Sequence, residues 1–268
     1  MEKLYKQIHM LSEEPTKYSD PNEVFDLPFP SVNEIPLRFS PLNEGRFSYM
    51  GRECFDRVFE AFSLIQGNSL QRQAVYIYGG KGFGKSHILA ALACLLVRTG
   101  TQVVYIPDCH ACLLDPRSYL IKAIAFAFVN SKPSFREEIL DCDDLESLAN
   151  FCARYRMFGR LCFIVDQFNA LDPEPMAQDA VSNADKESFR QLLNRMSTNH
   201  IMITSASADH KSFRHMVERE SGEQKVSLMG GMTSVRVVLC VMPTLNPALV
   251  RNVFLVETPR ILGFQRCR

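Results

Sequence analysis

One short run of the chain brings together the residue types that bind phosphate. Residues 76–92 read YIYGGKGFGKSHILAAL, with four glycines and two lysines between two apolar stretches. From Gly79 onward the spacing fits the phosphate-loop (Walker A) pattern GxxxxGKS/T without a mismatch. Glycines allow positive φ and let backbone N–H groups approach phosphate oxygens. We therefore expect Lys85 to reach the β- and γ-phosphates of a nucleotide and the Ser86 hydroxyl to ligate Mg²⁺.

The residues around this run favour the same interpretation. The run follows an apolar stretch typical of a strand and opens a segment typical of a helix, and the N-terminus of a helix attracts anions. The alternative is a glycine-rich hairpin loop that happens to end in Lys-Ser. The residues that we predict to bind the nucleotide here are Gly79, Gly80, Lys81, Gly82, Phe83, Gly84, Lys85, Ser86 and His87.

A second acidic element is expected at the end of a neighbouring strand. In RLCFIVDQFNAL, the apolar residues 162–165 lead directly into Asp166, which we predict to hold Mg²⁺ through water, as a Walker B aspartate does. Many ATPases of this architecture have glutamate at the next position, where this chain has Gln167. Glutamine orients water but takes no proton at neutral pH. Hydrolysis is then slow, or uses Asn169 or Asp172; alternatively, Gln167 only caps the loop.

Further candidates lie at two other places. The segment ending TSASADH puts Ser205 and Ser207 near the tip of a strand, where either could sense the γ-phosphate or simply form a turn. In YMGRE, 28 residues before Gly79, the pair Gly51 and Arg52 resembles the adenine-side box of AAA+ and STAND ATPases. The alternative for that pair is a simple helix start.

These residues must be positioned by alternating strands and helices. Apolar runs predict strands over 74–78, 102–106, 161–166, 200–207 and 224–229. Helical spacing covers 85–98, 116–130, 145–157 and 185–197, and begins earlier with Phe55, Val58, Phe59 and Phe62. The fold class is therefore α/β, a three-layer P-loop NTPase with a mostly parallel sheet.

Three regions follow along the chain. Residues 1–45 are rich in proline and predict an irregular arm that wraps the surface or is partly disordered. Residues 46–233 are predicted to form the NTPase domain, and residues 234–268 an atypical C-terminal tail without clean periodicity.

Composition excludes some functions and leaves others open. Thirty basic residues balance thirty acidic ones, so charge does not support nucleic acid as a partner. A protein partner or a second copy of the chain is left open. Nine scattered cysteines, several within apolar runs, indicate reduced thiols in an intracellular soluble protein of the cytoplasm or nucleus. We expect no membrane partner and see no signal peptide, because the longest apolar run, 88–97, is half of the about 20 residues that a span requires.

Three smaller features add little to this interpretation. The CxxC spacing at Cys109 and Cys112 lacks the second pair that a structural zinc site needs. The sequence NADK at 183–186 is not the guanine-reading NKxD motif, which leaves adenine favoured. In the segment 211–220, Arg214 or Arg219 is a candidate arginine finger, although solvated helix charge explains both as well.

Taken together, YGGKGFGKSHILAAL, VVYIPDC, FIVDQFNAL and ITSASAD resemble the NTPase module of Crinkler effectors and of the related retrotransposon-hot-spot proteins. The resemblance covers about residues 50–230. It implies a STAND-like ATPase and, by family habit, a secreted effector that acts in a host nucleus or a selfish-element product. Residues 1–45 lack the leucine-phenylalanine-rich header of Crinklers, and the pattern after Thr233 departs from the family.

The sequence thus predicts an enzyme that binds ATP and Mg²⁺ and hydrolyses ATP slowly, as a switch or assembly motor. Two alternatives stay open at this point. One is a nucleotide-binding scaffold that does not turn over, and the other is an ATPase that assists a nucleic-acid-handling machine.

Overall fold

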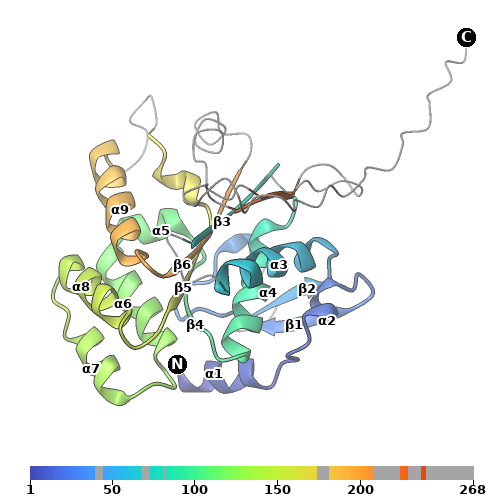
Figure 1. The fold of residues 1–268 in the computed structure, drawn as a ribbon, viewed down its shortest axis with the longest axis horizontal. Helices are drawn as coiled ribbons and strands as arrows, with labels where there is room; N and C mark the ends of the chain where they lie inside the picture. The colour runs from blue at the N-terminus through green and yellow to red at the C-terminus, as the bar shows by residue number, and fades with distance from the viewer. Residues whose placement is uncertain are drawn as a thin grey trace, which may run out of the picture.

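A six-stranded sheet with helices on both faces forms the centre of the molecule (Figure 1). The computed structural model describes residues 1–39, 45–67, 73–80, 82–173, 181–207, 224–228 and 237–239. The strand order is β4-β5-β6-β3-β7-β8. The predicted α/β class, with three layers and a mostly parallel sheet, is therefore confirmed.

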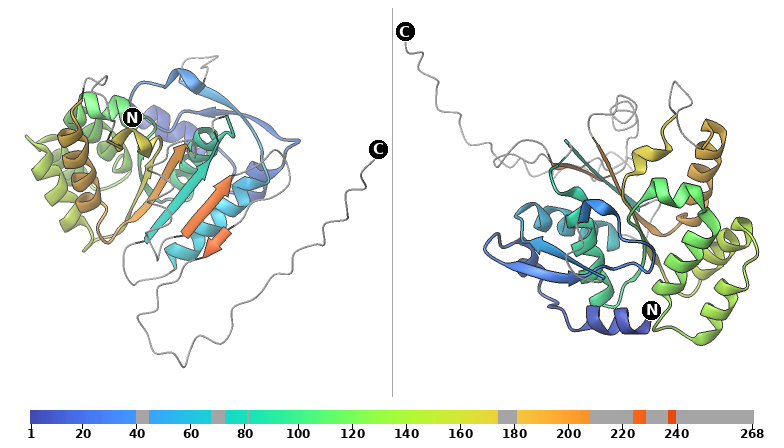
Figure 2. Two further views of the ribbon diagram at one scale, coloured as in Figure 1. Left: turned by 90° about the horizontal axis from the view of Figure 1, so that it is seen from above. Right: turned by 180° about the vertical axis from the view of Figure 1, so that it is seen from behind.

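The strands of the sheet match the apolar runs of the sequence. They are β3 (Gln73–Gly79), β4 (Gln102–Ile106), β5 (Leu161–Val165), β6 (Ile201–Ser207), β7 (Gln224–Leu228) and β8 (Val237–Leu239). All neighbours pair in parallel except β7 and β8, which are antiparallel. Seen from above, β3 runs between β6 and β7 (Figure 2, left). Parallel pairing brings the carboxyl ends of β3 to β7 to one edge of the sheet.

Helices cover the two faces in unequal numbers. On one face lie α1 (Glu2–His9), α3 (Cys54–Gln66) and α4 (Lys85–Arg98); on the other lie α5 (Cys109–Leu114), α6 (Pro116–Ala127), α7 (Pro133–Leu140), α8 (Leu145–Tyr155) and α9 (Asn183–Met196). Alternate strand residues feed the two resulting cores: Val75 and Ile77 join the first, and Ala74 and Tyr76 the second. Burial on both faces explains why the strands read as continuous apolar runs.

The N-terminal residues are more regular than the irregular arm that the sequence predicted. They form α1, α2 (Pro15–Ser19), β1 (Val24–Pro28) and a 3₁₀ turn, η1 (Leu37–Phe39), and β1 pairs antiparallel with β2 (Arg46–Met50). Ile8, Tyr18, Leu27 and Phe29 are buried in the core that contains α4. The region has only short helices, as its prolines predict, but the apolar residues between the prolines are buried in the core. The boundary predicted at residue 45 falls between the two strands of this hairpin.

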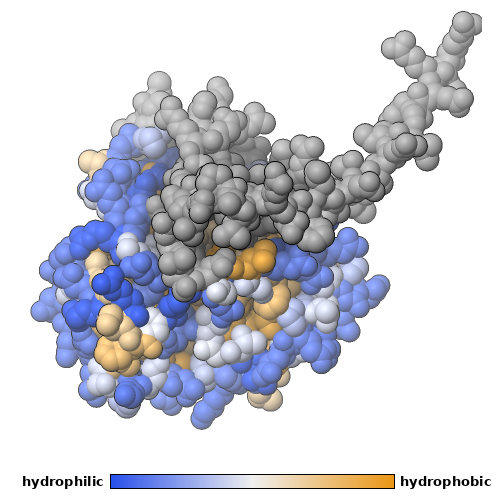
Figure 3. Space-filling view, in the orientation of Figure 1, coloured by the Kyte–Doolittle hydropathy of each residue, from blue (hydrophilic) through white to orange (hydrophobic). Residues whose placement is uncertain are grey.

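Several predicted features lie outside the described residues. Of the predicted tail, 234–268, the structure describes only β8, and residues 208–223, with Arg214 and Arg219, are not described. Within the described part, no helix is both long and apolar enough to cross a membrane. The face of the molecule in Figure 3 is mainly hydrophilic, as expected when the apolar side chains fill two cores.

Candidate nucleotide site

The glycine-rich run lies at the turn from β3 into α4, which is the context that the sequence predicts. Gly79 ends the strand and Gly84 is the N-cap of the helix. Gly82 and Gly84 have φ of +87° and +76°, values that side-chain-bearing residues rarely adopt. Lys81 lies outside the described residues. The positive φ angles of Gly82 and Gly84 thus explain why glycine is needed where the chain turns from β3 into α4.

Lys85 occupies the inner side of this turn. Its Nζ donates hydrogen bonds to the carbonyl oxygens of Gly79 and Gly80, each at 2.7 Å. The ammonium is thereby held over the loop on the first residue of α4. Phe83 covers the loop from outside, since a Cβ added at Gly80 would lie 2.6 Å from Cε2 of that ring.

A single guanidinium joins the glycine-rich loop to the end of β5. Arg38, on η1, donates from Nε to the Ser86 hydroxyl (3.2 Å) and from Nη2 to Asp166 Oδ2 (3.1 Å). Asp166 is 2 % exposed, and its pairing with Arg38 supplies a buried countercharge. Ser86 and Asp166, which the motifs predict to act together, are thus brought to one place.

Two residues just after β4 complete a cluster of side chains around the Arg38 guanidinium, which we call the Arg38 cluster. Arg38 Nη1 contacts Asp108 Oδ2 at 3.3 Å, and Nη2 also donates to the carbonyl oxygen of Pro107. Asp108 caps α5 as well, because its Oδ1 accepts from the backbone N–H of Ala111 at 3.0 Å. The cap fixes the carboxylate in the orientation that meets Arg38.

Gln167 lies in this cluster on strained backbone. Its φ of 57° is left-handed, which costs a glutamine free energy, and its N–H donates to Asp166 Oδ1 at 2.9 Å. With its amide oxygen turned toward Arg38, the side chain accepts from Nη1 (3.1 Å) and donates to Asp108 Oδ1 (3.2 Å), the orientation that satisfies both amide atoms. The side chain is directed into the cluster, not out to solvent as a plain loop cap would be.

Ser205 comes from β6, the strand between β3 and β5. Its buried hydroxyl donates to Asp166 Oδ1. The side chain of Ser207 is outside the described part of the structure, so of the two predicted serines only Ser205 has a described contact with the cluster. Its role as a sensor of the γ-phosphate stays a prediction.

Gly51 and Arg52 make contacts in different places, Gly51 within the N-terminal arm and Arg52 at the glycine-rich loop. A Cβ at Gly51 would overlap the carbonyl oxygen of Asp20, and the N–H of Gly51 donates to Glu23 O at 2.9 Å. Close packing within the arm therefore explains why this position is a glycine. Arg52 reaches the glycine-rich loop, where Nη1 contacts Phe83 O at 3.3 Å and lies against Gly84. An adenine-binding role for Gly51 stays a prediction.

His87 faces the arm. Its ring packs 4.8 Å from that of Phe39 and 6.0 Å from that of Phe47, centroid to centroid. Burial, followed by the charges of Arg52 and Arg38, lowers the pKa of the imidazole. The side chain is therefore neutral at pH 7 and adds no charge to the loop.

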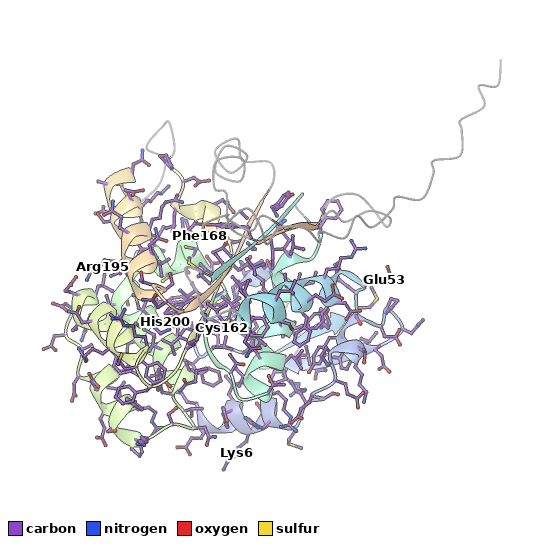
Figure 4. All side chains as sticks on the ribbon, viewed as in Figure 1. Lys6, Glu53, Cys162, Phe168, Arg195 and His200 are labelled. Carbon is purple, nitrogen blue, oxygen red and sulfur yellow. The ribbon has the colours of Figure 1, made fainter. Side chains whose placement is uncertain are left out.

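The remaining candidates of the sequence lie at the edge of the site. Asp172 pairs with Arg190 at 3.0 Å, and this engagement makes it a poor base for activating water. Arg190 in turn lies 5.3 Å over the ring of Phe168, which follows β5 near the carboxyl edge of the sheet (Figure 4). Cys109 and Cys112 are buried, and burial raises the pKa of both thiols, so they remain protonated.

The donor set fits a hard divalent cation. One hydroxyl and two carboxylates converge on the Arg38 guanidinium, from Ser86, Asp108 and Asp166. Oxygen ligands of this kind are those that Mg²⁺ takes in phosphate-transfer sites. The hydroxyl of Tyr105 is buried without a partner in the described part of the chain, and burial, followed by the charge of Asp166, raises its pKa. A polar ligand or water at this place would satisfy it.

Sequence reasoning missed two members of the cluster. Asp108 follows a strand just as Asp166 does, so the rule that found one carboxylate could have found the other. Arg38 stands in IPLRFS, which matches no motif. Only the fold brings it across to the ends of β4 and β5.

A comparison of the chain with protein-family models gives no match, and a comparison with curated proteins gives none.

Proposed function

We propose that this protein is a P-loop ATPase of the STAND or AAA+ type that binds ATP with Mg²⁺ and hydrolyses it slowly. One observation carries the proposal. Ser86 at the start of α4 and Asp166 at the end of β5 contact the same cationic group, at 3.2 and 3.1 Å. A hydroxyl beside a glycine-rich loop and a buried carboxylate at the same edge of the sheet are what a metal–triphosphate site needs.

Each residue has a distinct task in the proposed site. Lys85, already directed over the loop, would move from the carbonyls of Gly79 and Gly80 to phosphate oxygens. Ser86 and Asp166 would hold magnesium, the latter through water. The bound metal supplies positive charge to the phosphate oxygens.

Two further side chains act on the proposed chemistry. Ser205 fixes the Asp166 carboxylate by its hydrogen bond. Gln167, whose side chain points into the cluster, would orient the attacking water. It accepts no proton, so the proton must leave with the phosphate or to solvent, and turnover is slow.

A non-hydrolysing nucleotide scaffold is the second candidate, and the same glutamine favours it. The cluster contains two carboxylates near Gln167, but each contacts the Arg38 guanidinium. Neither is free to act as a base while that contact lasts. While that contact lasts, hydrolysis depends on how well Gln167 orients the attacking water.

The resemblance to Crinkler effectors leads us to propose the same kind of role, a nucleotide-driven switch or assembly motor. The motifs that support it are the ones that form the cluster, since YIPDC includes Asp108 and VDQFNAL includes Asp166.

The proposal is tested by nucleotide binding and single-turnover hydrolysis. Lys85→Ala should weaken binding of ATP–Mg²⁺ by about 10-fold or more, because hydrogen bonds to charged groups are lost. At a ligand concentration of 100 times the wild-type dissociation constant, ATP–Mg²⁺ should stabilise the wild type by about 2.7 kcal/mol and a variant that binds 10-fold more weakly by about 1.4 kcal/mol. Lys122→Ala, an exposed lysine on α6, is the matched control. Equal binding by wild type and Lys85→Ala would refute the site, whereas binding without turnover in the wild type would select the scaffold.

A further inference from the structure

The Arg38 guanidinium is enclosed by acceptors on several sides. It contacts Ser86, Asp108 and Asp166 through side chains and Pro107 through its carbonyl oxygen. The side chain is about three-quarters buried, at 25 % exposure. In each of these contacts an N–H group of Arg38 donates to an oxygen. The surrounding oxygens therefore form a site for a cation, and the Arg38 guanidinium occupies it.

The position is the one that the proposed function gives to the metal. Ser86 and Asp166 are the two groups expected to hold Mg²⁺, and Arg38 already bonds to both. A guanidinium and a hydrated divalent ion between the same hydroxyl and the same carboxylate would exclude each other by size and by charge. One of them must leave for the other to bind.

We propose that Arg38 and magnesium compete for this position, an inference that rests on the proposed function. Arg38 holds the two carboxylates when no metal–nucleotide complex is bound, and arrival of that complex drives the guanidinium out. Arg38 is thus a side-chain cation that the metal must replace.

The packing of Phe39 on η1 indicates that the side chain of Arg38 can leave the site without the backbone of η1 moving. Phe39 is buried, with ring centroids 4.9 Å from Phe29 and 5.4 Å from Phe47, whereas Leu37 is 91 % exposed. The guanidinium carbon of Arg38 lies 5.4 Å from the centroid of the Phe39 ring. Phe39 therefore holds the arm in place while the long side chain of Arg38 swings out of the site.

Competition predicts opposite effects on two affinities. Without metal, Arg38 supplies positive charge beside the phosphates, so its removal should weaken nucleotide binding. With metal, Arg38 must be displaced, and its removal should strengthen binding. A residue that bound phosphate alongside the metal would instead weaken both when removed.

The test compares Arg38→Gln with wild type by titration of a non-hydrolysable ATP analogue, once in Mg²⁺ and once in EDTA. We expect about 10-fold tighter binding in Mg²⁺ and about 10-fold weaker binding in EDTA, in line with the usual size of allosteric coupling. Arg46→Gln is the matched control. It removes an arginine of the same hairpin that pairs with Asp26 at 2.6 Å, and it should change neither value.

A second measurement uses the metal alone. Mn²⁺ in place of Mg²⁺, followed by electron paramagnetic resonance without nucleotide, should bind more tightly to Arg38→Gln than to wild type. Arg38→Lys keeps a charge but loses the planar fork, and should fall between the two; it also replaces Arg38→Gln if that variant does not fold.

The outcomes separate the two hypotheses. Weaker analogue binding in both buffers, or unchanged binding in both, overturns the competition and leaves the proposed function standing. A wild type that binds no nucleotide in either buffer refutes the proposed function. In that case the Mn²⁺ titration still decides the competition, because equal Mn²⁺ affinity in wild type and Arg38→Gln would overturn it.

Discussion

At the scale of single residues, Gln167 is the position where local strain and the site coincide. Its left-handed backbone costs about 1–3 kcal/mol for a residue other than glycine. The conformation is retained because it turns the N–H toward Asp166 and the side chain toward Asp108 and Arg38. A glycine would remove the strain but also the amide that lies in the cluster.

Gln167→Glu should accelerate single-turnover hydrolysis of ATP. A positioned general base contributes about 10²–10⁴-fold, and glutamate adds the proton acceptor that glutamine lacks while keeping its length. Gln167→Ala should slow hydrolysis, since nothing then orients water. Dissociation constants for ATP–Mg²⁺ are measured in parallel, because glutamate cannot donate the hydrogen bond to Asp108 and the effect of this loss on binding must be separated from the change in turnover. If glutamate gives no faster turnover, Gln167 does not stand where the water attacks.

Residue types and spacing identified part of this cluster in advance. Lys85, Ser86 and Asp166 could be predicted because their motifs specify a position. Lys85 and Ser86 belong to a strand-to-helix turn, and Asp166 follows the end of a strand. Arg38 could not be predicted, because its partners lie on α4 and just after β4 and β5, and no local pattern encodes a contact between such distant segments.

At the scale of elements, the order of strands places the cluster. Because β6 lies between β3 and β5, Ser205 stands beside Asp166 while the glycine-rich loop leaves from the far side of β6. The strands themselves were predictable from apolar runs with both faces buried. Their order was not, because periodicity is local, whereas strand pairing is decided by the packing of helices far apart in the chain.

The arm is joined to the rest of the fold where two backbones touch, and Gly51 is the residue that permits this. Gly51→Ala should lower the free energy of unfolding by about 1–3 kcal/mol, because its Cβ would overlap the carbonyl oxygen of Asp20 and backbone cannot move aside cheaply. Chemical denaturation measures the change. Gly67→Ala is the control, since its Cβ would meet only Ser63 O at 3.9 Å at the end of α3, and we expect it to be neutral or slightly stabilising. Equal stability of the two variants would mean that the arm is not held at Gly51.

At the scale of the whole molecule, the sheet separates two cores, and a neutral imidazole is built into the second. His200 precedes β6 and is 1 % exposed (Figure 4). Its Nδ1 accepts from the Leu161 N–H at 3.2 Å, while Nε2 lies 2.9 Å from Cys152 O. Both contacts are satisfied only by the neutral ring with its proton on Nε2. The side chain thus links β5, β6 and α8 as long as it stays uncharged.

Stability should therefore fall as the pH drops from 7 toward 5. Burial, with smaller effects of Arg160 and Arg156, lowers the pKa of His200 below that of an unfolded histidine, about 6.5, although the contact to Cys152 opposes the shift. Below pH 6.5 the unfolded chain then binds more protons than the folded one, so acid favours unfolding, by at most about 1.4 kcal/mol per pH unit for one group. Denaturant titrations at pH 7 and 5 measure this loss. His200→Gln should reduce it without removing it, because the pKa of His87 is lowered as well, whereas His110→Gln, an exposed control on α5, should leave it unchanged. An identical loss in wild type and His200→Gln would show that His200 takes up its proton without leaving the core.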